Sequence, residues 1–152
     1  MIVHVLPDTV YGNDFMDFLG RMYDIEKHYI YVSIGVAKTK IVSQNKRCSW
    51  EYLSKNNMRE FSQKVKNADM LIVHGLFNLL VILWLFLNPY QIKKTIISIW
   101  GGELYDHRDI IEKNNIAYTK KMLDFIKGRI FQKVPVFLND MEGDFELLKE
   151  WY

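Results

Sequence analysis

Runs of apolar residues alternate along this chain with stretches in which apolar and polar positions mix. The runs are short, rich in β-branched and aromatic residues, and stopped by glycine, proline or polar residues, which is typical of buried strands. Strands are therefore expected at residues 2–6, 28–34, 69–73, 95–100 and 134–138, and residues 41–43 are a candidate for one more short strand.

Between these runs, apolar residues recur every three or four positions, which is the spacing of an amphipathic helix. Asn13, for example, can cap a helix whose apolar face begins at Phe15 and continues through Phe18 to Met22. Further helices are expected within residues 50–67, from about residue 106, around 118–126, and over 143–151. The apolar run 76–87, stopped by Asn88 and Pro89, predicts a helix that is buried on nearly all sides.

Strands that alternate with helices predict an α/β fold with a doubly wound, mainly parallel sheet and helices on both faces. Such a domain is Rossmann-like. No linker, repeat or low-complexity segment interrupts the pattern, so residues 1–152 are expected to form a single domain.

Composition narrows the class of protein further. The chain has 49% hydrophobic and 14% aromatic residues, which excludes a disordered chain, and the lone Cys48 cannot form an intrachain disulfide, which favours a reducing compartment. Twenty basic against 18 acidic residues leave a net charge of +2, too little to indicate a nucleic-acid binder. The first residues do not resemble a signal peptide, and the run 76–87 is shorter than the roughly 20 residues that span a bilayer. A cytoplasmic location is expected.

Ligands of doubly wound sheets bind beyond the carboxyl ends of the strands, so the residues after each strand are the candidates for chemistry. After the strand at 95–100, two glycines permit close backbone approach, while Glu103 and Tyr105 supply a carboxylate and a hydroxyl that suit a polar ligand such as a sugar. The alternative is a tight turn in which Trp100 packs in the core and the acidic residues lie near a helix N-terminus.

Histidines offer a second group of candidates. His74 follows the strand at 69–73 and can act as a general base, or donate to a phosphate or sugar oxygen, or form a structural bond to a backbone carbonyl. Asn78 is either a polar group in the first turn of a helix or a ligand contact, and His4 lies either in the core or toward a cleft. A basic cluster is either a solvated helix face or a contact for an anionic membrane or a diphosphate; it comprises Lys120, Lys121, Lys127, Arg129 and Lys133.

Common catalytic signatures are missing from the sequence. There is no P-loop, no G-x-G-x-x-G after the first strand, no G-x-S-x-G elbow and no H-E-x-x-H or C-x-x-C pattern. These absences remove support for P-loop NTPases, nucleotide oxidoreductases, serine hydrolases and zinc enzymes.

Three blocks together resemble a known family: residues 3–6 with Asp8, residues 73–78 (V-H-G-L-F-N) leading into L-W-L, and residues 99–105 (I-W-G-G-E-L-Y). They are similar to blocks in the N-terminal half of the bacterial dTDP-4-acetamido-4,6-dideoxygalactose (N-acetylfucosaminyl) transferase family, which acts in enterobacterial common antigen synthesis. The resemblance implies a GT-B glycosyltransferase, whose active site lies in a cleft between two Rossmann-like domains.

In such an enzyme this chain corresponds to the N-terminal acceptor domain, and the donor domain is not part of it. The resemblance implies transfer of an amino-deoxy sugar such as N-acetylfucosamine from a dTDP-sugar to a lipid-linked saccharide, on the cytoplasmic face of an anionic membrane that the protein contacts peripherally. It implies no metal, no further cofactor and no nucleic-acid partner, and the chain alone is expected to be inactive.

Matched positions carry the site residues that the resemblance implies. The proton acceptor is either Glu103 or His74, and the substrate-binding residues are His4, Asp8, Gly75, Asn78, Trp100, Gly101, Gly102 and Tyr105. Two other functions stay open: a non-catalytic α/β binding or interaction domain, and a small-molecule enzyme of flavodoxin-like topology with an unidentified cofactor.

Overall fold

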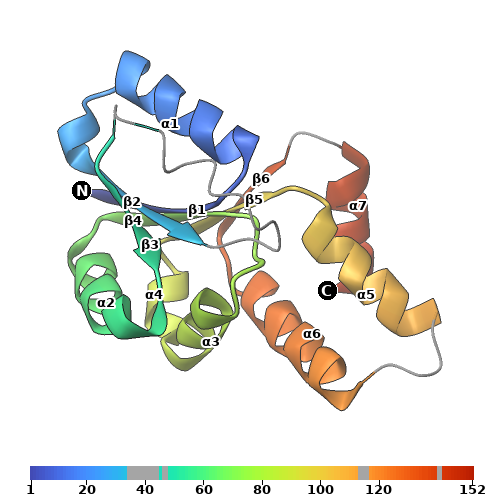
Figure 1. Ribbon diagram of the computed structural model, residues 1–152. Helices are drawn as coiled ribbons and strands as arrows, with labels where there is room; N and C mark the ends of the chain where they lie inside the picture. The colour runs from blue at the N-terminus through green and yellow to red at the C-terminus, as the bar shows by residue number, and fades with distance from the viewer. Residues whose placement is uncertain (34–44, 46–47, 113–116, 140–141) are drawn as a thin grey trace. The chain divides into compact units, whose positions relative to one another are not determined.

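The computed structural model describes residues 1–33, 45, 48–112, 117–139 and 142–152 of the chain. Its contacts divide the chain into two compact units, a first unit of Met1–His74 and a second unit of Gly75–Tyr152. Parallel strands alternate with helices in both (Figure 1), which confirms the predicted α/β class.

Strands of the first unit form a parallel sheet with the order β3-β2-β1-β4. They are β1 (Ile2–Pro7), β2 (His28–Ser33), β3 (Trp50–Leu53) and β4 (Met70–His74). The chain adds β2 and β3 on one side of β1 and then returns to place β4 on the other side. This reversal at β1 is the doubly wound, Rossmann-like arrangement that the sequence predicts.

Helices α1 (Val10–Met22) and α2 (Met58–Asn67) cover opposite faces of this sheet (Figure 1). Ile30 belongs to the apolar cluster that Met16 and Leu19 of α1 complete, whereas the ring of its neighbour Tyr31 meets Phe61 of α2 edge-on, with centroids 5.1 Å apart. Successive residues of a strand point to opposite faces, so β2 is buried on both sides. That burial explains its unbroken apolar run.

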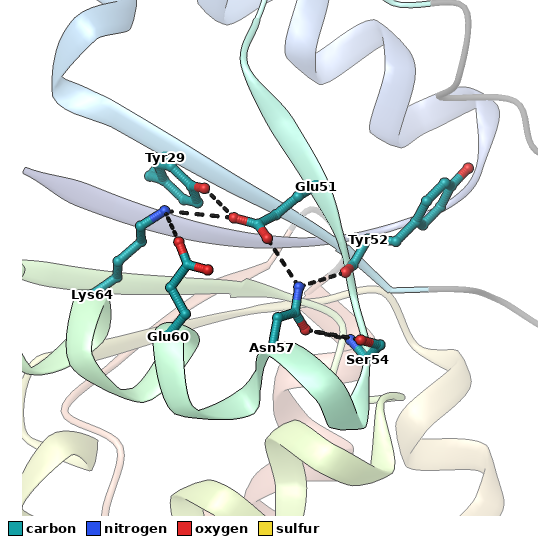
Figure 2. A network of polar contacts seen from close by, with 7 residues as sticks. All are labelled: Tyr29, Glu51, Tyr52, Ser54, Asn57, Glu60 and Lys64. Atoms are coloured by element: carbon teal, nitrogen blue, oxygen red, sulfur yellow. Dashed lines mark hydrogen bonds and ion pairs between the residues drawn. The ribbon is translucent and has the colours of Figure 1, made fainter.

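A polar network ties the edge strand β3 to α2 (Figure 2). The Tyr29 hydroxyl donates to Glu51, and the Lys64 ammonium lies 3.5 Å from Glu51 Oε1 and 2.8 Å from Glu60 Oε1. Asn57 donates to Glu51 Oε2 at 3.0 Å. Burial acts to raise the pKa of Glu51, but the hydrogen bonds from Tyr29 and Asn57 and the Lys64 charge outweigh it and lower that pKa. The ionised carboxylate is therefore the form that holds the network together.

The predicted helix over 50–67 is wrong in its first part. Residues 50–53 form β3, because Trp50 and Tyr52 alternate with Glu51 and pack on each other edge-on, with centroids 5.0 Å apart. Ser54 and Asn57 then cap each other in a short helical turn, η3 (Lys55–Asn57), before α2 begins. The helix α1 also begins earlier than expected, since Thr9 caps it in place of Asn13. Residues 41–43 lie outside the described part of the chain.

The second unit contains two parallel strands, β5 (Thr95–Ile99) and β6 (Val136–Asn139). Its helices are α3 (Leu79–Leu87), α4 (Pro89–Ile92), α5 (Gly102–Glu112), α6 (Tyr118–Phe131) and α7 (Glu142–Trp151). The first unit also has a short helical turn before β2, η1 (Ile25–Lys27). The helix α6 contacts both α3 and α5, and α5 also contacts α7.

The expectation that residues 76–87 are buried on nearly all sides is wrong. One side of α3 is buried through Val81, Ile82, Trp84 and Leu85, while the opposite side exposes Leu79, Leu83, Phe86 and Leu87. The run is apolar all round, so its sequence does not distinguish the buried side from the exposed one. Within the described ranges, no helix is both long and apolar enough to cross a membrane.

Candidate functional site

The winding of the first unit reverses between β1 and β4, and doubly wound folds bind ligands beyond the carboxyl ends of strands at such a point. Asp8 follows β1 directly and His74 is the last residue of β4. Both side chains are buried, and the Tyr52 hydroxyl donates to Asp8 Oδ2 at 2.9 Å. Two residues that the sequence singled out therefore lie at the expected binding edge of this sheet.

Three imidazoles form a hydrogen-bonded chain across the sheet, here called the histidine row: His74 on β4, His4 on β1 and His28 on β2. His4 Nδ1 lies 3.3 Å from His74 Nε2, and His4 Nε2 lies 2.8 Å from His28 Nδ1. Neighbouring rings are nearly parallel, at 27° and 26°. The row runs from the amino end of β2 to the carboxyl end of β4.

Strand register produces this row. His4 is paired with Ile30 of β2 and with Ile72 of β4. His28 precedes Ile30 by two residues and His74 follows Ile72 by two, so all three imidazoles project from the same face. Since that face carries α1, Phe15 of α1 covers the row, with its ring centroid 4.3 Å from that of His74.

Burial keeps the row uncharged. It lowers the pKa of His4 to about 3, with further contributions from His74 and His28, and lowers the pKa of His74 to about 4. Burial also lowers the pKa of the more exposed His28. At neutral pH each ring therefore has one N–H donor and one acceptor nitrogen, which suits a chain of N–H···N bonds. Within the described ranges, no group of three or more His, Cys, Asp or Glu residues is arranged to hold a metal ion.

His28 is the member of the row that the sequence analysis missed. His4 and His74 stood out because each adjoins a motif, whereas His28 begins a strand with no motif around it. Only the pairing of β2 with β1 reveals its place. A search for histidines at matching positions of neighbouring strands could have found it.

In the second unit, the segment after β4 forms a tight turn. Gly75 has a φ of 78°, and its N–H donates to the Ser98 carbonyl at 2.8 Å. The Asn78 side chain accepts the N–H groups of Leu80 and Val81 at 2.9 and 3.2 Å. Asn78 therefore caps α3, which is one of its two predicted roles.

The turn after β5 is organised around the fully buried Glu103. Its two carboxylate oxygens accept the Trp100 N–H at 3.2 and 3.3 Å. Burial raises the pKa of Glu103, although backbone N–H groups, including those of Trp100 and Leu76, and the Lys127 charge act in the opposite direction. The carboxylate thus holds the backbone of the turn that contains Gly101, whose φ is 82°.

The other predicted residues of this turn lie around it. The half-exposed Tyr105 donates from its hydroxyl to Asp144 Oδ1 at 3.4 Å. A Cβ on Gly102 would lie 3.3 Å from the Phe77 ring, so this glycine permits a close approach. The structure thus brings His4 and His74 into contact in the first unit and places Asp8 after β1 in the same unit, where it binds Tyr52. The second unit contains the other predicted site residues: Gly75, Asn78, Trp100, Gly101, Gly102, Glu103 and Tyr105.

We expect Gly75→Ala to destabilise the chain by about 1–2 kcal/mol, because a side chain strains the left-handed backbone at this position. An added Cβ would also lie 2.1 Å from Phe77 Cε2, so that ring must move. Gly143→Ala is the matched control, since a Cβ there meets nothing within 4 Å. Urea unfolding measures both variants, and equal stability of the two would contradict the argument.

Known proteins provide no match to this chain. No family model, no curated protein and no solved structure matches it.

Proposed function

We propose that this chain is the acceptor domain of a glycosyltransferase. The enzyme would transfer an amino-deoxy sugar, such as N-acetylfucosamine, from a dTDP-sugar to a lipid-linked saccharide in the synthesis of a cell-envelope polysaccharide. The observation that carries the proposal is His74, a neutral imidazole at the carboxyl end of β4, within one of the three blocks that resemble the transferase family. The parallel α/β architecture supports it as well.

Of the two candidate bases, the contacts favour His74. The carboxylate of Glu103 is fully buried and already accepts backbone N–H groups, so it acts as a positioning group for the turn. His74 uses one ring nitrogen, Nε2, toward His4, which leaves Nδ1 for a substrate hydroxyl. Its lowered pKa keeps the imidazole unprotonated and able to accept a proton at neutral pH.

The low pKa also means that a buried His74 does not keep a proton that it accepts. The histidine row would carry this proton away. His74 Nδ1 takes the proton of the acceptor hydroxyl as that oxygen bonds to the anomeric carbon and the dTDP leaves. The Nε2 proton of His74 passes to His4 Nδ1, the Nε2 proton of His4 passes to His28 Nδ1, and His28 Nε2 releases one proton to water. One proton enters and one leaves, so no buried imidazolium persists.

A transfer assay tests the proposed function. Membranes from cells that express the complete gene product should transfer labelled sugar from the dTDP-sugar to endogenous lipid-linked saccharide. If no sugar is transferred under these conditions, the proposed function is contradicted.

Residues 1–152 alone should fold but not transfer sugar, because the donor half supplies the stabilisation of the leaving diphosphate. Circular dichroism checks the fold and the same assay checks the activity. Robust turnover by this chain alone would refute the division into acceptor and donor halves.

Peripheral membrane contact is the second part of the proposal, since a lipid-linked acceptor is confined to a membrane surface. Lys120, Lys121 and Arg129 are exposed on α6, but Lys127, expected to join them, is only 4% exposed and is unavailable to lipid. Each exposed cation near an anionic surface contributes about 1 kcal/mol and is screened by salt.

Binding to anionic vesicles should therefore disappear at high salt and in a variant with all three exposed cations replaced by glutamine. Co-sedimentation at low and high salt measures it, with Leu83→Ser and Phe86→Ser as the comparison variants on the exposed side of α3. Binding that resists salt and is abolished by the α3 changes would assign the contact to that helix.

A further inference from the structure

A groove of about 280 Å³ lies in the second unit, and its lining includes Lys121 and Arg129 of the basic cluster that the sequence singled out. One face of α6 forms its floor, since the lining residues of this helix recur every three or four positions: Lys121, Asp124, Phe125, Gly128 and Arg129, followed by the C-cap Gln132. His107 of α5 and the chain's last two residues, Trp151 and Tyr152, complete the lining. A Cβ on Gly128 would lie 2.7 Å from the Tyr152 ring, so this glycine makes room for the tyrosine.

A polar triad fixes the orientation of His107 in this groove. His107 Nδ1 lies 2.7 Å from Asp124 Oδ2, and the Tyr152 hydroxyl donates to Asp124 Oδ1 at 2.6 Å. Both carboxylate oxygens are thus engaged, and the two paired side chains are mostly buried, 17% exposed for His107 and 12% for Asp124. The Asp124 bond assigns the proton to Nδ1 and leaves Nε2 for a ligand.

Two cations border the same groove. Lys121 lies on α6 two turns before Arg129, whose guanidinium is held 5.3 Å from the centroid of the Phe125 ring. Arginine fits a phosphate with two parallel hydrogen bonds, and lysine adds a mobile positive charge. The aromatic rings supply apolar walls on which the remainder of a ligand can rest.

We propose that this groove binds a phosphate-bearing ligand, with the phosphate between Lys121 and Arg129 and with His107 Nε2 as a third partner. The carboxylate of Asp124 faces His107 and Tyr152, so it orients the imidazole and does not compete for the cations. The volume suits a phosphate with a few attached atoms, because sites for drug-sized ligands start at about 300 Å³. The phosphate can come from a soluble ester or from a lipid headgroup. This inference does not depend on sugar transfer, although Lys121 and Arg129 are also among the cations proposed to contact the membrane.

The test titrates the chain with inorganic pyrophosphate, and in a parallel arm with phosphatidic acid vesicles, by calorimetry and by the NMR shifts of the His107 imidazole. Arg129→Gln should weaken binding roughly tenfold, the effect of losing one charge-assisted hydrogen bond. His107→Gln should weaken it by a smaller factor. Lys133→Gln is the matched control, since it also removes one positive charge, but from an exposed side chain outside the groove.

Binding in the pyrophosphate arm with loss only in the groove variants supports a soluble phosphate ester as the ligand. Binding in the vesicle arm alone, with the same pattern among the variants, supports a lipid headgroup. The proposal is overturned if neither arm shows binding, or if Arg129→Gln and Lys133→Gln weaken binding equally, because a general charge effect then accounts for the result. Arg129 is exposed, so its replacement leaves the fold intact and the comparison interpretable.

Discussion

His74→Asn should lower kcat of the complete enzyme by roughly 10²–10⁴-fold, the usual contribution of a general base. Asparagine keeps a polar group beside His4 but cannot accept a proton from the acceptor hydroxyl. The variant should stay folded, because the change removes one hydrogen bond, worth about 1 kcal/mol, from a well-packed sheet. Steady-state transfer kinetics and circular dichroism measure the two quantities.

Glu103→Gln is the comparison that separates the two candidate bases. An amide in place of this carboxylate gives the buried turn fewer acceptors for its N–H groups, so we expect lower stability and a smaller loss of kcat than in His74→Asn. If Glu103→Gln remains fully folded and loses more kcat than His74→Asn, Glu103 is the base. His28→Asn should reduce kcat less than His74→Asn, since His28 only releases the proton.

Lowering the pH from 7 to 5 should reduce the free energy of unfolding by roughly 3 kcal/mol. His4 and His74 have folded-state pKa values of about 3 and about 4, below the ordinary value of 6.5. The unfolded chain therefore binds more protons than the folded chain below pH 6.5. The stability that these two groups contribute is complete above that pH and is lost as the pH falls toward 4 and 3.

Urea unfolding between pH 7 and 5 measures this loss, with His4→Asn as the variant that should flatten the pH dependence. Glu51 does not interfere, because its lowered pKa makes its own contribution vanish only below about pH 4.5. The raised pKa of Glu103 opposes the loss and the lowered pKa of His28 adds to it, so the comparison with His4→Asn isolates the contribution of His4. Phe61→Leu is the control, since it disturbs packing on the opposite face of the sheet without uncovering the row or changing a titratable group. An equal pH dependence in wild type and His4→Asn would contradict the account of the row.

The fold class was predictable because strands buried on both faces, such as β2, read as unbroken β-branched and aromatic runs. The sequence does not distinguish a strand from a helix at Trp50–Leu53, because four residues are too few to separate a period of 2 from a period of 3.6. Pairing with β2 makes this segment a strand. The buried and exposed sides of α3 were not predictable for a related reason, since every residue of that helix is apolar.

Site residues next to a motif were found from the sequence, but their contacts were not. The sequence places His74 at the end of a strand, yet its bond to His4 depends on how β1 and β4 are registered. His107 of α5 and Asp124 of α6 are 17 residues apart in the chain, and no local sequence pattern links them. Long-range register and helix packing are tertiary properties that a single sequence does not display.

Binding of the acceptor to this chain tests the central claim most directly. The measurement follows the imidazole signals of residues 1–152 by NMR during titration with a short-chain, diphosphate-linked saccharide. The account predicts saturable binding that shifts the signals of His74 and His4 and is weakened in His74→Asn. No binding, or binding that leaves both signals unchanged, would contradict the claim that this chain receives the acceptor at the carboxyl end of β4.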